Sequence, residues 1–278
     1  MIPITLPVVA FPMIDPILVE FGPLAIRWYS LAYVGGLLFA WWYIRRLNGS
    51  YVTFGLTPPL KPDEGDDLLF WATLGVILGG RLGYVLFYQA GYYWDHPLEV
   101  FAVWQGGMSF HGGLLGVAVA LTAFCRRRSM PLIAVADLLA CAVPFGLMLG
   151  RAANFINGEL FGRPSDVPWA MVFPFGGPDL RHPSQLYEAA LEGALLFVIM
   201  GMLFRLTNIR AYTGALTGLF LVGYACARGV SEMFRQPDVH LGFLTGGTTM
   251  GQLLSIPMAA MGFYLLHRSR GQKATAIR

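Results

Sequence analysis

The sequence is poor in charged residues, which excludes an ordinary soluble protein. Only 13% of the 278 residues are Asp, Glu, Lys or Arg, whereas a soluble domain carries roughly 25%. Hydrophobic residues make up 56% of the chain and gather in recurring runs. Several runs approach the roughly 20 residues that cross a bilayer. Barrel strands would be shorter and would alternate. We therefore predict an all-α polytopic membrane protein, built as a single domain over residues 1–278.

Several targeting and catalytic signals are also missing. The first 24 residues contain no Lys or Arg, so the basic segment that opens a cleaved signal peptide is absent. Cys125, Cys141 and Cys226 have no CxxC spacing and fall within or beside apolar runs, which favours a packing role. The absence of HExxH, P-loop and GxSxG motifs argues against a metalloprotease, an ATPase and a serine hydrolase. We expect no metal, no other cofactor and no nucleic-acid partner.

Seven apolar segments are predicted to cross the membrane as helices. The segments run from about Trp28 to Ile44, Leu68 to Tyr88, Phe110 to Phe124, Pro131 to Gly150, Pro183 to Phe204, Thr213 to Arg228 and Met250 to Leu266. The polar, Pro- and Gly-rich stretch from Arg151 to His182 is too irregular to face lipid. We expect it to form a small irregular portion on the periplasmic side, and Pro97 to Trp104 to form a short interfacial helix.

The placement of the 19 Lys and Arg residues predicts the orientation of these helices. If the N-terminus is periplasmic and the C-terminus cytoplasmic, the inner side holds twelve of them: Arg45, Arg46, Lys61, Arg126, Arg127, Arg128, Arg205, Arg210, Arg268, Arg270, Lys273 and Arg278. This is the positive-inside pattern. The other seven are all arginines near the outer ends of helices: Arg27, Arg81, Arg151, Arg163, Arg181, Arg228 and Arg235.

Arginines on the outer side have three possible roles. They snorkel to the headgroups, pair with buried carboxylates, or grip an anionic ligand. No lysine accompanies the seven, and arginine is the residue that binds phosphate or carboxylate in a bidentate way. We therefore favour an outer-leaflet pocket for an anionic group, most simply a phospholipid phosphate.

The strongest candidate site is the stretch Gly150 to Gly162, which reads G-R-A-A-N-F-I-N-G-E-L-F-G. It places one arginine, two asparagines and one glutamate at the end of an apolar segment. Charge is costly at such a position, so the cluster indicates a functional site.

A second candidate is His111, which follows Gly106 and Gly107 and precedes Gly112 and Gly113 at the start of a predicted helix. The glycines either allow close helix packing or make room for a substrate. Imidazole is the usual general base near neutral pH, so we favour a catalytic or substrate-contacting role for His111.

Three further sets of polar residues share a helix face because they recur every three or four positions. These are Glu188 with Glu192 beside Tyr187; Tyr224, Arg228 and Glu232; and Arg81, Tyr84 and Tyr88. A pair formed by Arg228 and Glu232 is either purely structural or holds the guanidinium ready for a ligand.

The motifs together resemble those of the bacterial prolipoprotein diacylglyceryl transferases. The resemblance covers nearly the whole chain. It is carried by H-G-G-L-L-G at His111 to Gly116, the long signature at Gly150 to Gly162, R-H-P-S-Q-L-Y-E at Arg181 to Glu188, and F-R-Q-P-D at Phe234 to Asp238. Ala153 stands where many members have glycine, and because alanine is the next smallest residue we expect no disturbance of the site.

The resemblance implies transfer of a diacylglyceryl group from phosphatidylglycerol to the thiol of the lipobox cysteine in a prolipoprotein signal peptide. It implies a multi-pass protein of the bacterial inner membrane whose active site faces the periplasm. His111, Arg151 and Arg228 match catalytic residues of the family. His111 either takes the thiol proton or positions the headgroup while an arginine lowers the thiol pKa. We expect the other matching or neighbouring polar residues to bind phosphatidylglycerol or to support the site: Tyr29, Arg81, Tyr84, Asn154, Asn157, Glu159, Gly162, His182, Glu188, Tyr224, Glu232 and Arg235.

Two other classes of function stay open at this point. An anion or lipid transporter would carry polar residues across the bilayer midplane, whereas here they gather at the outer ends of helices. A non-catalytic protein that binds anionic lipid would show binding without turnover.

Overall fold

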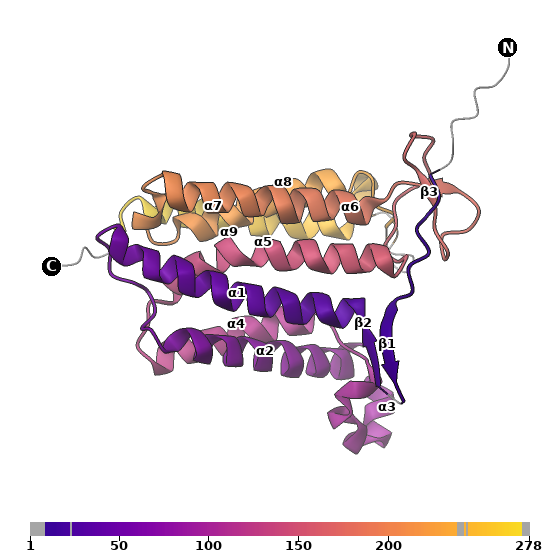
Figure 1. The fold of residues 1–278 in the computed structure, drawn as a ribbon, viewed down its shortest axis with the longest axis horizontal. Helices are drawn as coiled ribbons and strands as arrows, with labels where there is room; N and C mark the ends of the chain where they lie inside the picture. The colour runs from indigo at the N-terminus through magenta and orange to yellow at the C-terminus, as the bar shows by residue number, and fades with distance from the viewer. Residues whose placement is uncertain (1–8, 23, 238–241, 243, 274–278) are drawn as a thin grey trace, which may run out of the picture. The chain divides into compact units, whose positions relative to one another are not determined.

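The computed structural model describes residues 9–22, 24–237, 242 and 244–273 (Figure 1). The chain divides into two compact units. The first unit takes its described residues from 1–40 and 137–275, and the second unit from 41–136.

All seven predicted segments are helical. They correspond to α1 (Trp28–Thr53), α2 (Glu64–Phe87), α4 (Phe110–Arg127), α5 (Leu132–Ile156), the continuous helix Ser184–Leu206, α8 (Ala215–Ser231) and α9 (Met250–Ser269). Among the described residues, three helices are long and apolar enough to span a membrane: Glu64–Phe87, Leu132–Ile156 and Ser184–Leu206. A shorter apolar helix is Ala215–Ser231. The protein is thus a helical, multi-pass membrane protein, while seven crossings and their orientation stay predictions.

The second unit is held together by α2 and α4, which meet backbone to backbone. Gly75, Gly79 and Gly83 form one stripe on α2, and they face Gly112 and Gly116 on α4. A Cβ added at Gly75 would lie 2.8 Å from the carbonyl oxygen of Gly116. One added at Gly83 would lie 2.7 Å from the Cα atom of Gly112. Small residues spaced by four are the usual means of close helix approach in membranes, so the packing alternative is confirmed for Gly112.

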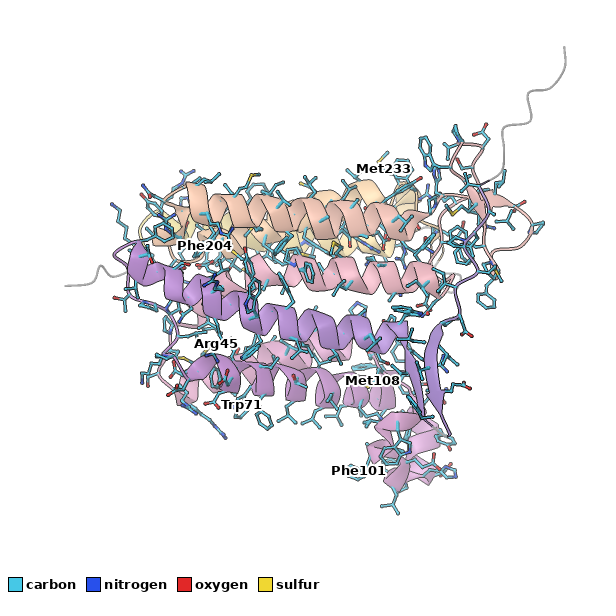
Figure 2. The ribbon with its side chains drawn as sticks, viewed as in Figure 1. Arg45, Trp71, Phe101, Met108, Phe204 and Met233 are labelled. Atoms are coloured by element: carbon cyan, nitrogen blue, oxygen red, sulfur yellow. The ribbon has the colours of Figure 1, made fainter. Side chains whose placement is uncertain are left out.

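The segment between α2 and α4 is short and rich in exposed aromatics. It contains α3 (Ala90–Asp95) and two 3₁₀ turns, η1 (Pro97–Phe101) and η2 (Val103–Gln105), where one short helix was predicted. Trp94, Leu98, Phe101 and Trp104 are largely exposed, and Figure 2 shows Phe101 on the outside of this segment. Such side chains favour the headgroup zone of a bilayer.

In the first unit, the later part of α5 lies beside the continuous helix 184–206 and the start of α8, and α8 packs on α9 (Figure 1). The continuous helix consists of α6 (Ser184–Glu188), the π-helical turn η3 (Ala189–Leu195) and α7 (Leu196–Leu206). The apolar core of the first unit contains four fully buried side chains, those of Leu138, Met200, Phe204 and Leu216.

Asp137 on α5 is a buried polar tie in this unit. Its carboxylate accepts hydrogen bonds from the backbone N–H groups of Gly214 at 2.6 Å and Thr217 at 2.7 Å, and from the Thr217 hydroxyl at 2.7 Å. These donors lie at the start of α8, where backbone N–H groups have no partner within the helix. One α5 side chain therefore caps α8.

The polar stretch after α5 is irregular, as predicted. It contains two short strands, β3 (Met171–Val172) and β4 (Leu180–Arg181), which pair antiparallel. Near the N-terminus, β1 (Ile17–Phe21) and β2 (Leu24–Arg27) form a second antiparallel hairpin. The remaining elements are two 3₁₀ turns, η4 (Ile209–Ala211) and η5 (Thr245–Gly247).

Candidate functional site

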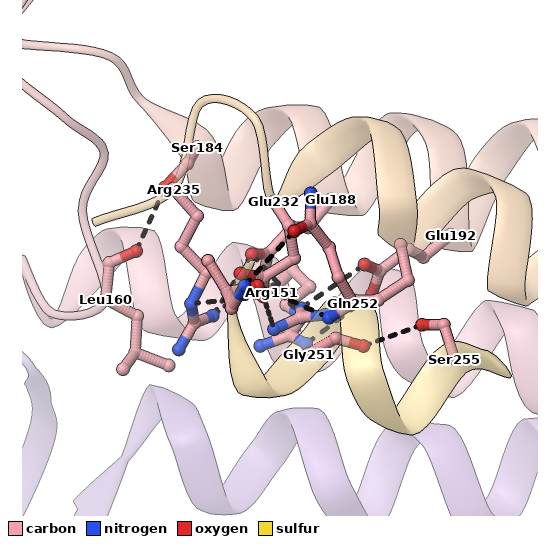
Figure 3. Close-up of polar contacts among 12 residues, drawn as sticks. Arg151, Leu160, Ser184, Glu188, Glu192, Glu232, Arg235, Gly251, Gln252 and Ser255 are labelled. Carbon is pink, nitrogen blue, oxygen red and sulfur yellow. Dashed lines mark hydrogen bonds and ion pairs between the residues drawn. The ribbon is translucent and has the colours of Figure 1, made fainter. Parts of the chain in front are cut away.

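Three arginines and three glutamates form one buried cluster in the first unit, which we call the ionic cluster (Figure 3). Its members come from four places in the chain: Arg151 from α5, Glu188 and Glu192 from the continuous helix 184–206, Arg228 from α8, and Glu232 and Arg235 from just beyond α8. The formal charges balance at three against three. The cluster joins helices that are far apart in the sequence.

Glu188 contacts all three arginines. Its carboxylate lies 2.9 Å from Arg151 Nε, 3.3 Å from Arg228 Nη1 and 3.1 Å from Arg235 Nη1. Glu192 lies 3.5 Å from Arg151 Nη2 and 3.3 Å from Arg228 Nη1.

Glu232 completes the cluster from the end of α8. It accepts a short hydrogen bond from Arg228 Nη2 and lies 3.9 Å from Arg235 Nε. The predicted pairing of Arg228 with Glu232 is therefore confirmed, as part of a larger network.

The two kinds of charge differ in burial. The Glu188 and Glu192 side chains are 0% exposed, whereas Arg151 is 18% and Arg228 13% exposed. The two carboxylates are thus closed to solvent, whereas the two arginine side chains are partly open to it. A buried carboxylate is tolerated only when it is paired, and here each is paired at least twice. Chemically, the arrangement can present two fixed guanidiniums to an anion.

Local packing brings the glutamates to the arginines. A Cβ added at Gly193 would lie 2.6 Å from Met148 Cβ, so only glycine allows the continuous helix to approach α5 so closely. Glu192 precedes this contact, and Arg151 follows Met148 by three residues, about one helical turn. The π-helical turn η3 contains both Glu192 and Gly193.

The rest of the predicted signature forms the last turn of α5 and a compact loop after it. Asn154 and Asn157 each donate a side-chain hydrogen bond to Glu159 Oε1, at 2.8 and 3.0 Å. Ser184 donates to the Leu160 carbonyl and Gln185 to the Glu159 carbonyl, which fixes the loop to the start of α6. The asparagines therefore orient Glu159.

Gly162 is enclosed on two sides. A Cβ there would lie 2.6 Å from both His182 Cβ and the Phe234 carbonyl oxygen. The Gly162 N–H donates to the His182 carbonyl at 2.9 Å, and the Arg163 N–H donates to that of Phe234 at 2.8 Å. Glycine at this position lets three segments of the signature motifs cross. The last residue of the fourth motif, Asp238, lies outside the described residues.

His182 belongs to a small aromatic network beside this crossing. The Trp169 indole N–H donates to the Tyr187 hydroxyl at 2.6 Å, and that hydroxyl lies 3.1 Å from His182 Nδ1. Partial burial lowers the pKa of His182 below its ordinary value of 6.5, because burial disfavours the charged imidazolium. The described contacts connect His182 to the loop, and its contact with substrate stays a prediction.

Not all of the seven arginines that are predicted to lie on the outer side belong to the ionic cluster. Arg163 donates to the backbone carbonyls of Arg235 and Glu232, at 2.9 and 3.0 Å. Arg181 donates to the Gly176 and Gly162 carbonyls, at 2.8 and 3.3 Å. These two hold the irregular segment together, while Arg27 ends β2 and is exposed.

Arg81 lies in the second unit and is bound by backbone. Its guanidinium donates to the carbonyls of Val100 at 2.8 Å, Gly106 at 2.6 Å, Gly107 at 3.3 Å and Glu99 at 2.6 Å. Arg81 is only 4% exposed. Its described contacts hold the segment before α4, and its role toward the substrate stays a prediction.

Tyr84 and His111 also belong to the second unit. Tyr84 stacks on Tyr88, with ring centroids 5.5 Å apart. His111 is exposed in the first turn of α4. Ser109 caps this helix, because its side chain accepts a hydrogen bond from the Gly112 N–H. The predicted contact of these residues with substrate stays a prediction.

Two predicted aromatic residues lie in the first unit. Tyr29 is half-buried in the first turn of α1, and its hydroxyl lies 3.4 Å from that of Tyr33. Tyr224 is half-buried one turn before Arg228 on α8. The two therefore stay candidates for substrate contact.

Sequence reasoning left out one member of the ionic cluster. Glu192 shares a face with Glu188 by its spacing of four, yet it was not proposed as a site residue. The signal was present, because two glutamates on one face of an apolar segment are costly without partners. Ser184 and Gln185, which tie the signature loop, also lie within the third motif.

The comparisons with known proteins agree with the motifs. The family model for prolipoprotein diacylglyceryl transferase matches residues 16–268. A phosphatidylglycerol--prolipoprotein diacylglyceryl transferase of Paramagnetospirillum magneticum is 59% identical over 270 residues, covering 95% of this chain and 98% of the relative. One of Rhodospirillum rubrum is 56% identical over 269 residues, with 96% of each chain covered. The chain therefore belongs to the prolipoprotein diacylglyceryl transferase family.

Proposed function

We propose that this chain transfers the diacylglyceryl group of phosphatidylglycerol to the thiol of the lipobox cysteine in a prolipoprotein, the first step of lipoprotein maturation. The product is a thioether, and glycerol phosphate is released. The observation that carries the proposal is the pair Arg151 and Arg228. Both are partly exposed, and both form ion pairs with the buried carboxylates of Glu188 and Glu192. Membership of the family supports the same conclusion.

The proposed reaction is a displacement at a glycerol carbon. The thiolate sulfur attacks this carbon, the bond from the carbon to the phosphate oxygen breaks, and the bonding electrons leave with the phosphate. Guanidiniums that contact this phosphate orient the lipid and stabilise the leaving group. The thiol proton passes to a base, either His111 directly or another acceptor while His111 positions the headgroup.

The other candidate residues are assigned to binding and support. Within the ionic cluster, Glu188 holds both catalytic arginines and Glu232 holds Arg228. Arg235 pairs with these two glutamates and supports them. Asn154, Asn157, Glu159 and Gly162 shape the signature loop. We assign Tyr29, Arg81, Tyr84, His182 and Tyr224 to binding of phosphatidylglycerol or to support of that site.

The placement in the membrane is proposed from charge. Seven helices cross the bacterial inner membrane, the N-terminus and the site face the periplasm, and both units act as one transferase domain. The surplus of Lys and Arg on the opposite side supports this orientation. A reporter fused after Arg278, which lies outside the described residues, is expected to behave as cytoplasmic. An external signal would overturn the orientation.

The decisive test uses purified protein, phosphatidylglycerol and a peptide with a lipobox cysteine. Thioether product and glycerol phosphate are expected in equal amounts. Phosphatidylglycerol bound without product would favour a lipid-binding protein, and movement of lipid across a vesicle membrane without product would favour a transporter.

The role of His111 is tested separately. If His111 is the general base, His111→Gln lowers turnover by roughly 10²- to 10⁴-fold and alters its pH profile. Turnover that stays near normal across pH would exclude this role and leave the transferase activity in place.

A further inference from the structure

We propose that Glu192 is a positioning residue for the transfer reaction. Its buried carboxylate holds Arg151 and Arg228 side by side so that both guanidiniums meet one lipid phosphate. The inference depends on the proposed function, because it names what sets the geometry of that same site.

Glu192 differs from the other two glutamates in what it contacts. Glu188 and Glu232 both pair with Arg235 as well, whereas the ion pairs described for Glu192 are with Arg151 and Arg228 alone. The two contacts use different oxygens. Oε2 lies 3.5 Å from Arg151 Nη2, and Oε1 lies 3.3 Å from Arg228 Nη1. The Glu192 carboxylate therefore bridges guanidiniums from two helices, and it shares this bridging with Glu188, which contacts the same two arginines.

Burial determines which side of the arginines is left for a ligand. The Glu192 side chain is 0% exposed, while Arg151 and Arg228 keep 18% and 13% of theirs exposed. The carboxylate is closed to solvent while the two arginines are partly open to it, so a phosphate reaches the arginines from their exposed side. Guanidinium has five N–H donors, which allows it to bind a carboxylate and a phosphate together.

The local backbone conformation determines where the Glu192 side chain lies. Glu192 lies in the π-helical turn Ala189–Leu195, within an otherwise α-helical segment. The next residue, Gly193, is pressed against Met148 of α5. π-Helical turns inside α-helices occur frequently at functional sites. Here the turn and the glycine bring Glu192 to Arg151, which follows Met148 by about one turn of α5.

Removal of the Glu192 charge is expected to affect lipid binding and turnover in opposite directions. The ionic cluster is formally neutral, so Glu192→Gln leaves it with one positive charge. Binding of anionic phosphatidylglycerol is then favoured, while the guanidiniums lose one of the two carboxylates that bridge them. A residue that only stabilises the fold would not separate these two effects.

The test measures turnover of phosphatidylglycerol with a lipobox peptide, together with lipid binding by native mass spectrometry. For Glu192→Gln we expect kcat to fall roughly 10- to 100-fold while the Kd for phosphatidylglycerol falls about threefold. Glu192→Asp keeps the charge but shortens the side chain, so kcat is expected to fall with Kd unchanged. Asp137→Asn is the matched control, because Asp137 is a buried carboxylate of the same unit with no arginine among its described contacts. It is expected to lower the melting temperature and leave kcat and Kd as in wild type.

The outcomes separate this inference from the proposed function. An inactive wild-type protein would contradict the function itself. An active wild type with unchanged kcat in both Glu192 variants would overturn the positioning role alone. Weaker lipid binding by Glu192→Gln, or failure of both variants to accumulate, would assign Glu192 to folding and also overturn it.

Discussion

Two helix contacts in this protein are built from opposite chemistry. In the second unit, α2 and α4 meet through glycines, with backbone atoms in direct contact. In the first unit, α5, the continuous helix 184–206 and the end of α8 meet through three arginines and three glutamates. The glycine contact needs no desolvation of charge. The ionic cluster buries carboxylates completely, which is costly even when they are paired.

The difference teaches where function is expected. Close packing of small residues is sufficient to join membrane helices. An ionic contact that costs more than a glycine contact is retained when its charges have another use, and intramembrane ionisable residues are functional candidates for this reason. The two contacts should therefore respond differently to mutation: one in stability, the other in turnover.

The largest expected effect comes from Arg151→Gln in the ionic cluster. It removes a guanidinium from the phosphate and deprives the buried Glu188 of its closest partner, at 2.9 Å. We expect kcat/KM for phosphatidylglycerol to fall roughly 10²- to 10³-fold, measured with purified protein and a lipobox peptide.

The control for that loss is Arg128→Gln, which breaks an ion pair outside the cluster. Arg128 pairs with Asp67 at 2.5 Å, but the two side chains are 49% and 44% exposed. Exposed pairs contribute about 0–1 kcal/mol, so activity should be unchanged. A similar loss in both variants would show that the ionic cluster has no special role.

The glycine contact is broken by Gly112→Ala. The added methyl group meets the Gly79 carbonyl oxygen and lies 2.9 Å from the Gly83 Cα atom. Overpacking of this kind costs about 1–3 kcal/mol, so the melting temperature in detergent should fall. Gly113→Ala is the matched control, because its nearest neighbouring atom would be 3.6 Å away. Equal melting temperatures for the two variants would contradict the packing described here.

The cap on α8 gives an effect of intermediate size. Asp137→Asn replaces a carboxylate that accepts three hydrogen bonds with an amide that cannot accept all of them. We expect a loss of about 1–3 kcal/mol in stability, since hydrogen bonds to charged groups contribute more than neutral ones. Thermal unfolding measures this, and a reduced kcat per folded molecule would mean that Asp137 also serves the site.

The smallest effect concerns pH and His182. Its pKa is lower in the folded state than the ordinary 6.5, so the folded protein resists protonation that the unfolded chain accepts. Stability is full above pH 6.5 and falls as the pH drops from there through the lowered pKa. In His182→Gln the melting temperature should depend less on pH between pH 7 and 5. A pH dependence equal to that of the wild type would show that other groups dominate.

The sequence was sufficient for the helices and for the residues of the signature. Long apolar runs and an uneven placement of Lys and Arg predict membrane helices whatever their partners are. The Asn154, Glu159 and Gly162 positions follow from the family motif. These features are local in the chain, so a linear pattern carries them.

The pairing of charges could not be predicted in the same way. The spacing of Glu188 and Glu192 shows that they share a face, but not that the face meets Arg151 and Arg228. The π-helical turn and the contact of Gly193 with Met148 decide that, and both depend on tertiary packing. Arg81 shows the same limit. Its spacing on the helix does not reveal the four backbone carbonyls that accept hydrogen bonds from its guanidinium.

The central claim is that Arg151 and Arg228 contact the lipid phosphate during transfer. The most direct measurement uses phosphatidylglycerol in which sulfur replaces one non-bridging phosphate oxygen, as two separate stereoisomers. The wild-type protein should turn over one stereoisomer much more slowly than the other, because guanidinium binds the two oxygens in fixed positions. This discrimination should collapse in Arg151→Lys and Arg228→Lys, since lysine acts as a point charge. Discrimination that persists unchanged in both variants would contradict the claim.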